Sequence, residues 1–149
     1  MKLPKSSELK QYIVFEIDEE IYAVDVLFVE SIERMAQITR VPHSPYEVLG
    51  VINLRGDVIP VMSARRVLGY EEIPLTDATR VAIVRHNEYR IGMIVDRVTE
   101  ILNVPNDKVQ WGVEALDGKR KGVISGLINL GDKPVMVMDI PRTLELLLN

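Results

Sequence analysis

The chain has 149 residues, of which 47% are hydrophobic and 27% are charged, and its formal net charge is −4. This composition is typical of one folded domain, and the negative charge argues against capture of nucleic acid or of an anionic membrane by a broad basic surface. Cysteine is absent, which excludes disulfides, zinc–thiolate sites and cysteine nucleophiles and suits a reducing compartment.

The N-terminal segment has two early lysines, Lys2 and Lys5, but no apolar run of the kind that follows them in a signal peptide. No stretch of the chain approaches the roughly 20 apolar residues that a membrane helix needs. We therefore expect a cytoplasmic protein with no direct membrane insertion, which reaches a membrane only through its partners.

The first predicted elements are two strands, Tyr12–Ile17 and Ile21–Val26, which are apolar and β-branched and flank an acidic turn. This pattern predicts a β-hairpin. The apolar run that follows, Val26–Val29, cannot point inward throughout along one strand. A short helical turn would bury more of this run. If two of its side chains stay exposed instead, they form a patch suited to docking another protein.

The most distinctive stretch is GVINLRGDVIPV, Gly50–Val61, which predicts another hairpin. The glycine in its turn, Arg55–Asp57, supplies the positive φ that tight hairpins require. The strands are apolar on nearly both faces, which predicts burial inside a barrel on one side and against the other half of the chain on the second side. Ser63 and Gly69 are typical of the N-cap and the C-terminal stop of a short helix.

The second half of the chain repeats the pattern of the first half. Val81–Val84 and Ile91–Val95 repeat the first hairpin, with a turn between them. Gly126–Leu144 matches Gly50–Leu68 at a constant shift of 76 positions and includes the same Gly-x-Ile-Asn-Leu. We infer an internal duplication.

The duplication predicts how the chain is organised. Four or five short strands in each unit predict an all-β fold with two small barrels and a hydrophobic core between them. The units are 10–70 and 78–149, within a single domain that covers 10–149. Exchange of strands between the two units remains open.

No group of residues in the sequence predicts catalysis. The two histidines, His43 and His86, lack the spacing of a metal pair, and neither the dinucleotide fingerprint nor the P-loop pattern occurs. The basic loop Lys119–Lys121 has no interleaved aromatic residues for binding nucleic acid. Trp111 is expected to pack at a core edge or to contact a partner. The sequence therefore predicts no enzyme, no cofactor and no nucleic-acid partner.

Arg55 is the residue that the duplication singles out. At the shift of 76 positions it corresponds to Gly131, so the sister hairpin closes without an arginine. The turn itself does not require this side chain. Arg55 is then either an ordinary exposed or salt-bridged arginine, or an interface arginine, a residue type that is favoured at binding hot spots.

Three stretches together resemble the CheW family, the coupling proteins of bacterial and archaeal chemotaxis: GVINLRGDVIPV, YAVDVLFVESI (Tyr22–Ile32) and IGMIVDRVTEI (Ile91–Ile101). The resemblance covers residues 10–148. It implies two SH3-like, five-stranded β-barrels packed on a shared hydrophobic core, with short helices that include a C-terminal helix. It also implies a non-enzymatic adaptor that couples the cytoplasmic tip of methyl-accepting chemoreceptors to the regulatory domain of the histidine kinase CheA, in membrane-associated arrays.

The resemblance also carries over candidate site residues. The kinase-binding candidates are Ile13, Val26, Phe28 and Val29. The candidates for binding a receptor or another partner are Arg55, with Gly50, Asn53 and Leu54, which are expected near the family's receptor-binding groove between the barrels.

The sequence departs from the family pattern at two positions near these candidates. Ser31 stands where the family often has glutamate, which leaves open whether an acidic contact is replaced. Ser63-Ala64-Arg65 stands where Asp-Leu-Arg is usual, so the first helix could be capped and packed differently.

Two other functions remain open at this point. One is a CheW-like scaffold that serves a receptor–kinase pathway other than motility, which the sequence does not separate from chemotaxis. The other is a ligand-binding or oligonucleotide-binding β-barrel. Such a barrel would need aromatic residues along a strand face and a basic groove, whereas aromatic residues make up 5% of this chain.

Overall fold

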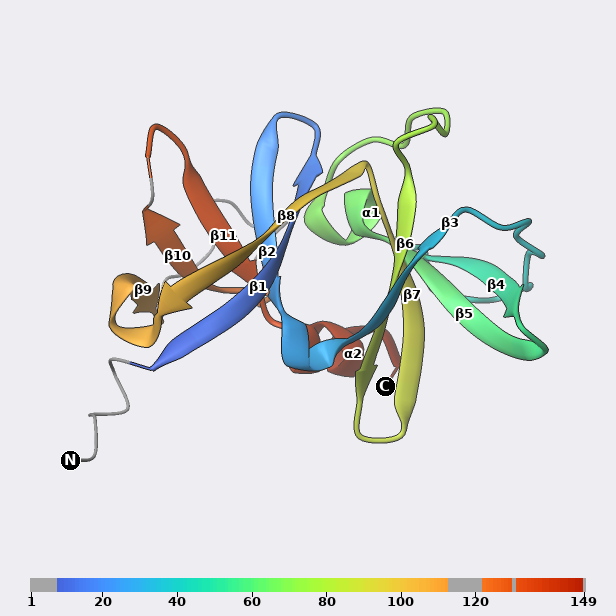
Figure 1. The fold of residues 1–149 in the computed structure, drawn as a ribbon. Helices are drawn as coiled ribbons and strands as arrows, with labels where there is room; N and C mark the ends of the chain where they lie inside the picture. Colours follow the sequence, from blue (N-terminus) through green and yellow to red (C-terminus); the bar gives the residue numbers. More distant parts are fainter. Residues whose placement is uncertain (1–7, 113–121, 130, 149) are drawn as a thin grey trace.

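The computed structural model describes residues 8–112, 122–129 and 131–148, which form β-strands with short helices between them (Figure 1). The strands in chain order are β1 (Leu9–Ile17), β2 (Glu20–Asp25), β3 (Val29–Arg34), β4 (Val48–Leu54), β5 (Asp57–Ser63), β6 (Arg80–His86), β7 (Tyr89–Val95), β8 (Arg97–Pro105), β9 (Val109–Trp111), β10 (Ile124–Asn129) and β11 (Pro134–Met138). The helical segments are η2 (Val26–Phe28), α1 (Ala64–Leu68), η3 (Asn106–Lys108) and α2 (Ile140–Leu148). The early lysines and the basic loop Lys119–Lys121 lie outside the described residues.

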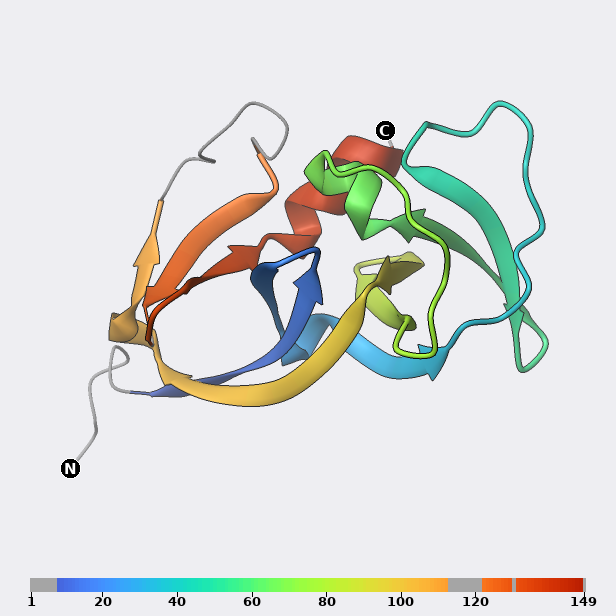
Figure 2. The same cartoon turned by 90° about the horizontal axis from the view of Figure 1, so that it is seen from above.

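The described strands form two sheets, each curled around its own interior (Figure 2). The first has the order β8-β1-β2-β11-β10-β9 and is called the terminal barrel, because it holds both the first and the last strands. The second has the order β3-β6-β7-β5-β4 and is called the central barrel. The central barrel has the five predicted strands. The terminal barrel has a sixth, the short β9, which pairs with β10.

Each barrel takes strands from both repeat units. The terminal barrel combines β1 and β2 of the first unit with β8–β11 of the second, and the central barrel combines β3–β5 with β6 and β7. The units are joined by two parallel pairings, β2 with β11 and β5 with β7, and by two antiparallel pairings, β1 with β8 and β3 with β6. The predicted hairpins are all present, but neither repeat unit closes a barrel alone. The reason is that hairpins are encoded locally, whereas the parallel joins link residues far apart in the sequence.

The central barrel closes through Gly50. Thr39 and Val51 exchange two backbone hydrogen bonds of 2.8 Å, which connect the chain after β3 to β4. Gly50 lies beside this bridge with a φ of 151°, and a Cβ atom there would lie 2.2 Å from the carbonyl oxygen of Thr39. Only glycine allows this close approach.

Three hydrophobic cores hold the fold together. The terminal barrel is filled around Tyr12 and Ile128, and the central barrel around Ile52 and Ile83. A larger core between them takes residues from both barrels and from both α-helices, among them Phe15 of β1 and Met93 of β7. The predicted core between the barrels is therefore confirmed.

The prediction that the β4–β5 hairpin is buried on both faces holds for only part of the hairpin. Met62 lies in the core between the barrels and Ile59 inside the central barrel, but Val58 is 67% exposed. The parallel pairing of β5 with β7 runs from Val61 to Ser63, so the half of β5 that contains Val58 is not paired with β7. The prediction is wrong at Val58 because the strand is longer than the surface that covers it.

Both α-helices begin at a side-chain cap, and the cap of α1 is the one that the sequence predicts. The hydroxyl of Ser63 accepts a hydrogen bond from the amide of Arg66, and Gly69 ends α1 with a φ of 88°. The carboxylate of Asp139 accepts one from the amide of Arg142 at the start of α2. α2 lies across the junction of the barrels (Figure 2) and buries Ile140, Leu144 and Leu147 in the shared core.

Candidate functional site

The apolar run after the first hairpin forms the short helical turn η2. The carboxylate of Asp25 accepts a hydrogen bond of 2.9 Å from the amide of Leu27 and so caps the turn. The turn buries none of its three residues, and Leu27 is 84% exposed. The structure has the helical turn, but Leu27 is the one fully exposed side chain of the run, and Val26, Phe28 and Val29 are half-buried.

The kinase-binding candidates gather around this turn. Phe28 and Val29 are half-buried and pack against the core between the barrels, and Val26 is also half-buried. Ile13 is 9% exposed and pairs with Ile101 of β8, which is 56% exposed. The apolar area on this face therefore continues from η2 and β3 across β1 to β8.

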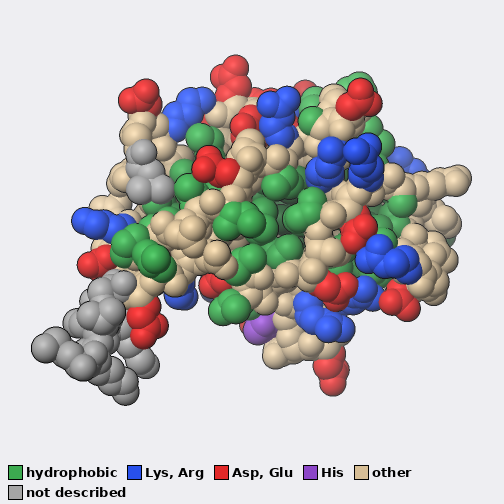
Figure 3. All heavy atoms as spheres, in the orientation of Figure 1, with side chains coloured by type: hydrophobic (Ala, Val, Ile, Leu, Met, Phe, Trp, Pro, Cys, Tyr) green, Lys and Arg blue, Asp and Glu red, His purple; other side chains and the backbone are tan. Residues whose placement is uncertain are grey.

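We call this area the junction surface and define it by Ile13, Val26, Leu27, Phe28, Val29 and Ile101. Figure 3 shows hydrophobic side chains gathered at the middle of this face, between the barrels, with charged side chains around them. The kinase-binding candidates from the sequence did not include Leu27, although it lies in the predicted apolar run, and they did not include Ile101. The signal for Ile101 is its cross-strand position opposite Ile13, which only the register of β1 and β8 reveals.

The second group of candidates shapes one tight turn. Arg55 and Gly56 both have positive φ, 51° and 91°, which is the pattern of a type I′ hairpin turn. Asn53 accepts a hydrogen bond of 3.0 Å from the amide of Gly56. Leu54 packs against the core of the central barrel. These neighbours hold the backbone, and the Arg55 side chain remains 68% exposed.

The position of this turn differs from the expectation. β4 lies at the edge of the central barrel and on the side away from the terminal barrel (Figure 1). Gly50, Asn53 and Leu54 are therefore not beside a groove between the barrels. The molecule has two separate candidate surfaces, the junction surface and the Arg55 turn.

Arg55 is an exception among the residues with positive φ. Within the part of the chain that the structure describes, the other non-glycine residues in this conformation are Asp18, His43 and Asn87, which are types that tolerate it. Arginine there costs roughly 1 kcal/mol in backbone strain. Because the turn disfavours arginine, its presence points to a role for the side chain.

The Arg55 side chain forms a two-pronged ion pair with Glu33 of β3, at 3.1 and 3.4 Å. The hydrogen bond from Arg55 lowers the pKa of Glu33, and the same bond raises the pKa of Arg55. Ser31, which stands where the family often has glutamate, lies two residues earlier on the same face of β3. In this chain the carboxylate that pairs with Arg55 is Glu33, and position 31 contributes none.

A second exposed ion-pair group lies next to the first. Arg90 donates to Glu30 at 2.5 Å and to Asp57 at 3.0 Å, and Arg85 lies 3.9 Å from Glu30. The hydrogen bond from Arg90 lowers the pKa of Glu30. These pairs give the β3, β5 and β7 region a surface of alternating charge, in contrast to the apolar junction surface.

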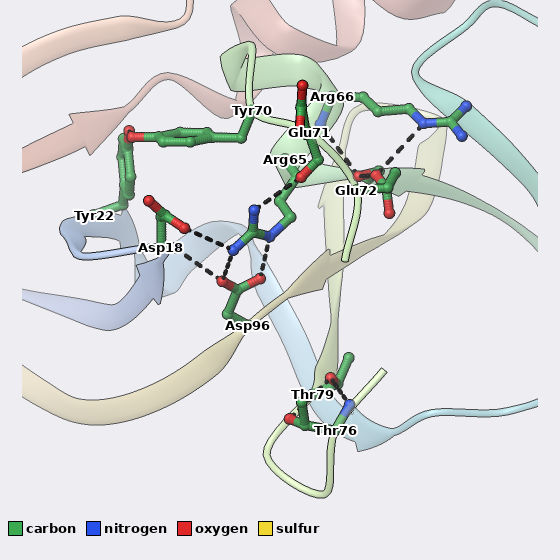
Figure 4. Close-up of polar contacts among 11 residues, drawn as sticks. Asp18, Tyr22, Arg65, Arg66, Tyr70, Glu71, Glu72, Thr76, Thr79 and Asp96 are labelled. Carbon is green, nitrogen blue, oxygen red and sulfur yellow. Dashed lines mark hydrogen bonds and ion pairs between the residues drawn. The ribbon is translucent and has the colours of Figure 1, made fainter. Parts of the chain in front are cut away.

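A buried arginine connects the two barrels (Figure 4). Arg65 of α1 is 7% exposed and donates to both carboxylate oxygens of Asp96, at 2.9 and 2.6 Å. It also donates to Asp18, at the tip of the β1–β2 hairpin of the terminal barrel, at 3.2 Å, and to the carbonyl of Glu71 at 2.8 Å. The bond to Asp96 raises the pKa of Arg65. From the sequence Asp18 is only part of the acidic turn between the first two strands, and the cluster is not predicted because its members come from three distant segments.

The structure shows the place of each residue in the Ser63-Ala64-Arg65 departure. Ser63 caps α1, Ala64 is buried in the core between the barrels, and Arg65 keeps the ion pairs. Near this cluster the hydroxyls of Tyr22 and Tyr70 lie 2.6 Å apart. We interpret this region as structural, because its charged groups are already paired with one another.

Within the described ranges, no group of three metal-binding side chains is close enough to hold a metal ion, and no helix has the length and apolar character to cross a membrane. His86 packs edge-on against Phe28, at 5.8 Å between ring centroids. His43 lies exposed in the connector after β3.

Comparisons with known proteins decide the family. The model of the CheW-like domain matches residues 11–147. This chain belongs to the CheW family. Among its relatives are the chemotaxis protein CheW of Helicobacter pylori, 32% identical over 97% of this chain and 87% of the relative, and that of Bacillus subtilis, 30% identical over 91% and 87%.

A solved structure supports the same assignment. The scaffolding protein TtCheW of Thermoanaerobacter tengcongensis superposes with a TM-score of 0.80 at 26% identity, over 89% of this chain and 85% of that one. The predicted fold of two SH3-like barrels is confirmed. The chain is a non-enzymatic CheW-family adaptor of chemotaxis, which couples chemoreceptors to the histidine kinase CheA.

Proposed function

We propose that the two surfaces divide the work of coupling: the junction surface binds the regulatory domain of CheA, and the Arg55 turn binds the cytoplasmic tip of a methyl-accepting chemoreceptor. The adaptor acts in the cytoplasm and is recruited to membrane-associated arrays through these partners. An adaptor that holds two partners at once needs two surfaces that do not overlap. The separation of the Arg55 turn from the junction surface supports this division.

Exposure of Leu27 is the observation that carries the kinase assignment. An exposed apolar patch surrounded by polar residues marks an interaction surface. Leu27 is 84% exposed and Ile101 is 56% exposed, whereas Ile13 is buried and Phe28 is half-buried. Docking another barrel there would remove this apolar area from water and stabilise the complex.

The receptor assignment rests on the chemistry of Arg55. Its guanidinium is mostly exposed, although it is paired with Glu33, and an exposed ion pair is weak. A carboxylate or a carbonyl group of a partner can therefore replace Glu33 or share the guanidinium. Arginine suits such contacts because its planar group both donates hydrogen bonds and packs against apolar surface.

The kinase assignment is tested by replacing Leu27 with glutamate. The exposed position should tolerate the change, so the thermal midpoint stays the same, while binding to the CheA regulatory domain weakens by about 2 kcal/mol or more. Binding is measured by pull-down with the kinase domain and with a receptor tip fragment, separately and together. The matched control is Leu75→Glu, since Leu75 is 60% exposed in the loop after α1. If Leu27→Glu and Leu75→Glu bind the kinase domain equally well, the assignment is wrong.

A further inference from the structure

A cavity lies at one end of the terminal barrel, next to the junction surface. Its volume is about 210 Å³, and its walls come from β1, β2, η2, β9–β11 and the start of α2. The residues that matter are Lys10, Tyr12, Asp25, Trp111, Ser125 and Asp139. The cavity shares Phe28 with the junction surface but lies apart from the Arg55 turn and the Arg65 cluster.

Tyr12 is the first sign that the cavity accepts a ligand. Its side chain is fully buried, and its hydroxyl has no hydrogen-bond partner among the described residues. Buried hydroxyls are nearly always paired, and an unpaired one is destabilising. Burial, together with the nearby Asp25, raises the pKa of Tyr12 to about 12, so the hydroxyl stays protonated and neutral.

The charges around the cavity favour a cation. Tyr12 and Asp25 are cross-strand partners, so the carboxylate stands beside the phenol. One oxygen of Asp25 caps η2, and the other makes only a loose ion pair of 3.7 Å with Lys10. Asp139 adds a second carboxylate to the wall.

Lys10 shows where a cation can lie. Its ammonium group is 5.8 Å from the centre of the Trp111 ring, within the range of a cation–π contact, and it faces Asp25. The Lys10 side chain is 43% exposed, so it can move out into solvent. A lysine of the protein itself thus occupies the rim of the site without reaching the hydroxyl of Tyr12.

We propose that this cavity binds the guanidinium group of an arginine side chain presented by a partner protein. The lining residues Asp25, Tyr12 and Ser125 come from different strands and each carries an oxygen that can accept a hydrogen bond, and a guanidinium has five N–H donors for such acceptors. Its flat face can stack on Trp111. An anion would be repelled by the two carboxylates, and an apolar group would leave Tyr12 unpaired.

The volume of the cavity suits one guanidinium group rather than a larger ligand. Sites for drug-sized ligands usually exceed about 300 Å³, whereas this one is about 210 Å³. The proposal concerns the isolated adaptor and does not rest on the assignment of its kinase and receptor surfaces. Its failure would leave those assignments untouched.

The chain provides its own probe, because Trp111 is its single tryptophan. The fluorescence of Trp111 is followed while the intact protein is titrated with Nα-acetyl-arginine amide at constant ionic strength. The matched ligand is Nα-acetyl-citrulline amide, which has the same shape without the charge, and free N-acetyl-tryptophan amide corrects for collisional quenching. A saturable response to the arginine probe alone is expected. A response that is only linear, or that is equal for the two probes, overturns the proposal.

Variants separate binding from folding. Asp25→Asn keeps an N-cap side chain and should weaken binding of the probe roughly tenfold, since hydrogen bonds to a charged group are strong. The matched control is Asp107→Asn, which removes an equal charge from η3, outside the cavity. Lys10→Met should strengthen binding because it removes the competing cation. Equal effects of Asp25→Asn and Asp107→Asn would show that the response is only a general effect of charge and would overturn the proposal.

Tyr12→Phe gives the most specific test. The hydroxyl has no partner in the described part of the chain, so its removal should leave the thermal midpoint unchanged or raise it. Binding of the arginine probe should nevertheless weaken severalfold. A variant that binds the probe as tightly as the wild type would show that the hydroxyl faces no ligand, and the proposal would fail.

Discussion

Arg55 and Arg65 lie ten positions apart and both pair with carboxylates through two nitrogens, but their surroundings are opposite. The Arg65 side chain is 8% exposed and joins segments of both barrels, whereas that of Arg55 is 68% exposed and joins a hairpin tip to a neighbouring strand. An ion pair that is already buried has no free surface to offer, and its loss is costly. An exposed ion pair contributes little to stability and stays available to a partner.

The largest expected effect is on stability, from Arg65→Ala. Removing the guanidinium leaves Asp96 without its main partner near the junction of the barrels. We expect a loss of about 3 kcal/mol in the free energy of unfolding, at the lower end for a buried pair because the Asp96 side chain is 22% exposed. Urea unfolding measures this value.

Arg66→Ala is the matched control for this prediction. Arg66 lies in the same helix, but its ion pair with Glu72 is at 3.4 Å and involves more exposed side chains. The expected loss is about 1 kcal/mol or less. Equal losses for the two variants would show that the Arg65 cluster does not hold the barrels together.

The next effect is on binding, from Arg55→Asn. Asn-Gly is the preferred sequence of a type I′ turn, so this change relieves strain while it removes the guanidinium. The free energy of unfolding should change by less than about 0.5 kcal/mol. Affinity for the receptor tip should fall by about 2 kcal/mol if Arg55 is a hot spot.

Co-sedimentation with receptor fragments measures this affinity, and Arg85→Asn is the control. Arg85 is a similarly exposed arginine on the central barrel, at 63% exposure of its side chain. Unchanged receptor binding in Arg55→Asn would place the hot spot elsewhere.

A smaller effect is expected from Glu33→Gln, which weakens the ion pair with Arg55 without touching the turn. Because that pair is exposed, unfolding should change little. The guanidinium becomes freer to meet a partner, so receptor affinity should stay the same or rise. A loss of affinity as large as that of Arg55→Asn would instead show that Glu33 positions Arg55 for binding.

The smallest effect concerns pH. The hydrogen bond from Arg90 holds the pKa of Glu30 below its ordinary value, so this pair stabilises the fold above the pKa of glutamate in the unfolded chain. That stabilisation is lost as the pH falls through the lower pKa of the folded state. Urea unfolding between about pH 7 and pH 3 should show the difference between the wild type and Glu30→Gln shrinking toward acid. A difference that is constant over this range would contradict the prediction.

The local sequence determined the hairpins, the helix caps and the duplication. The apolar, β-branched strands, the Arg55–Asp57 turn, Ser63 and Gly69 each depend on a few neighbouring residues, so their structures can be predicted locally. The resemblance over most of the chain then gave the family, and the comparisons confirm it.

The tertiary structure alone decided how these elements combine. The parallel joins of β2 with β11 and of β5 with β7 exchange strands between the repeats, and no local pattern encodes that choice. The same long-range packing buried Arg65 against Asp96, left Ile101 exposed opposite Ile13, and buried the hydroxyl of Tyr12 without a hydrogen-bond partner among the described residues. Whether an arginine forms a buried structural ion pair or stays exposed for a partner depends on which distant segment covers it. In the sequence Arg55 and Arg65 are both arginines near a hairpin, and only the fold makes one of them available to a partner.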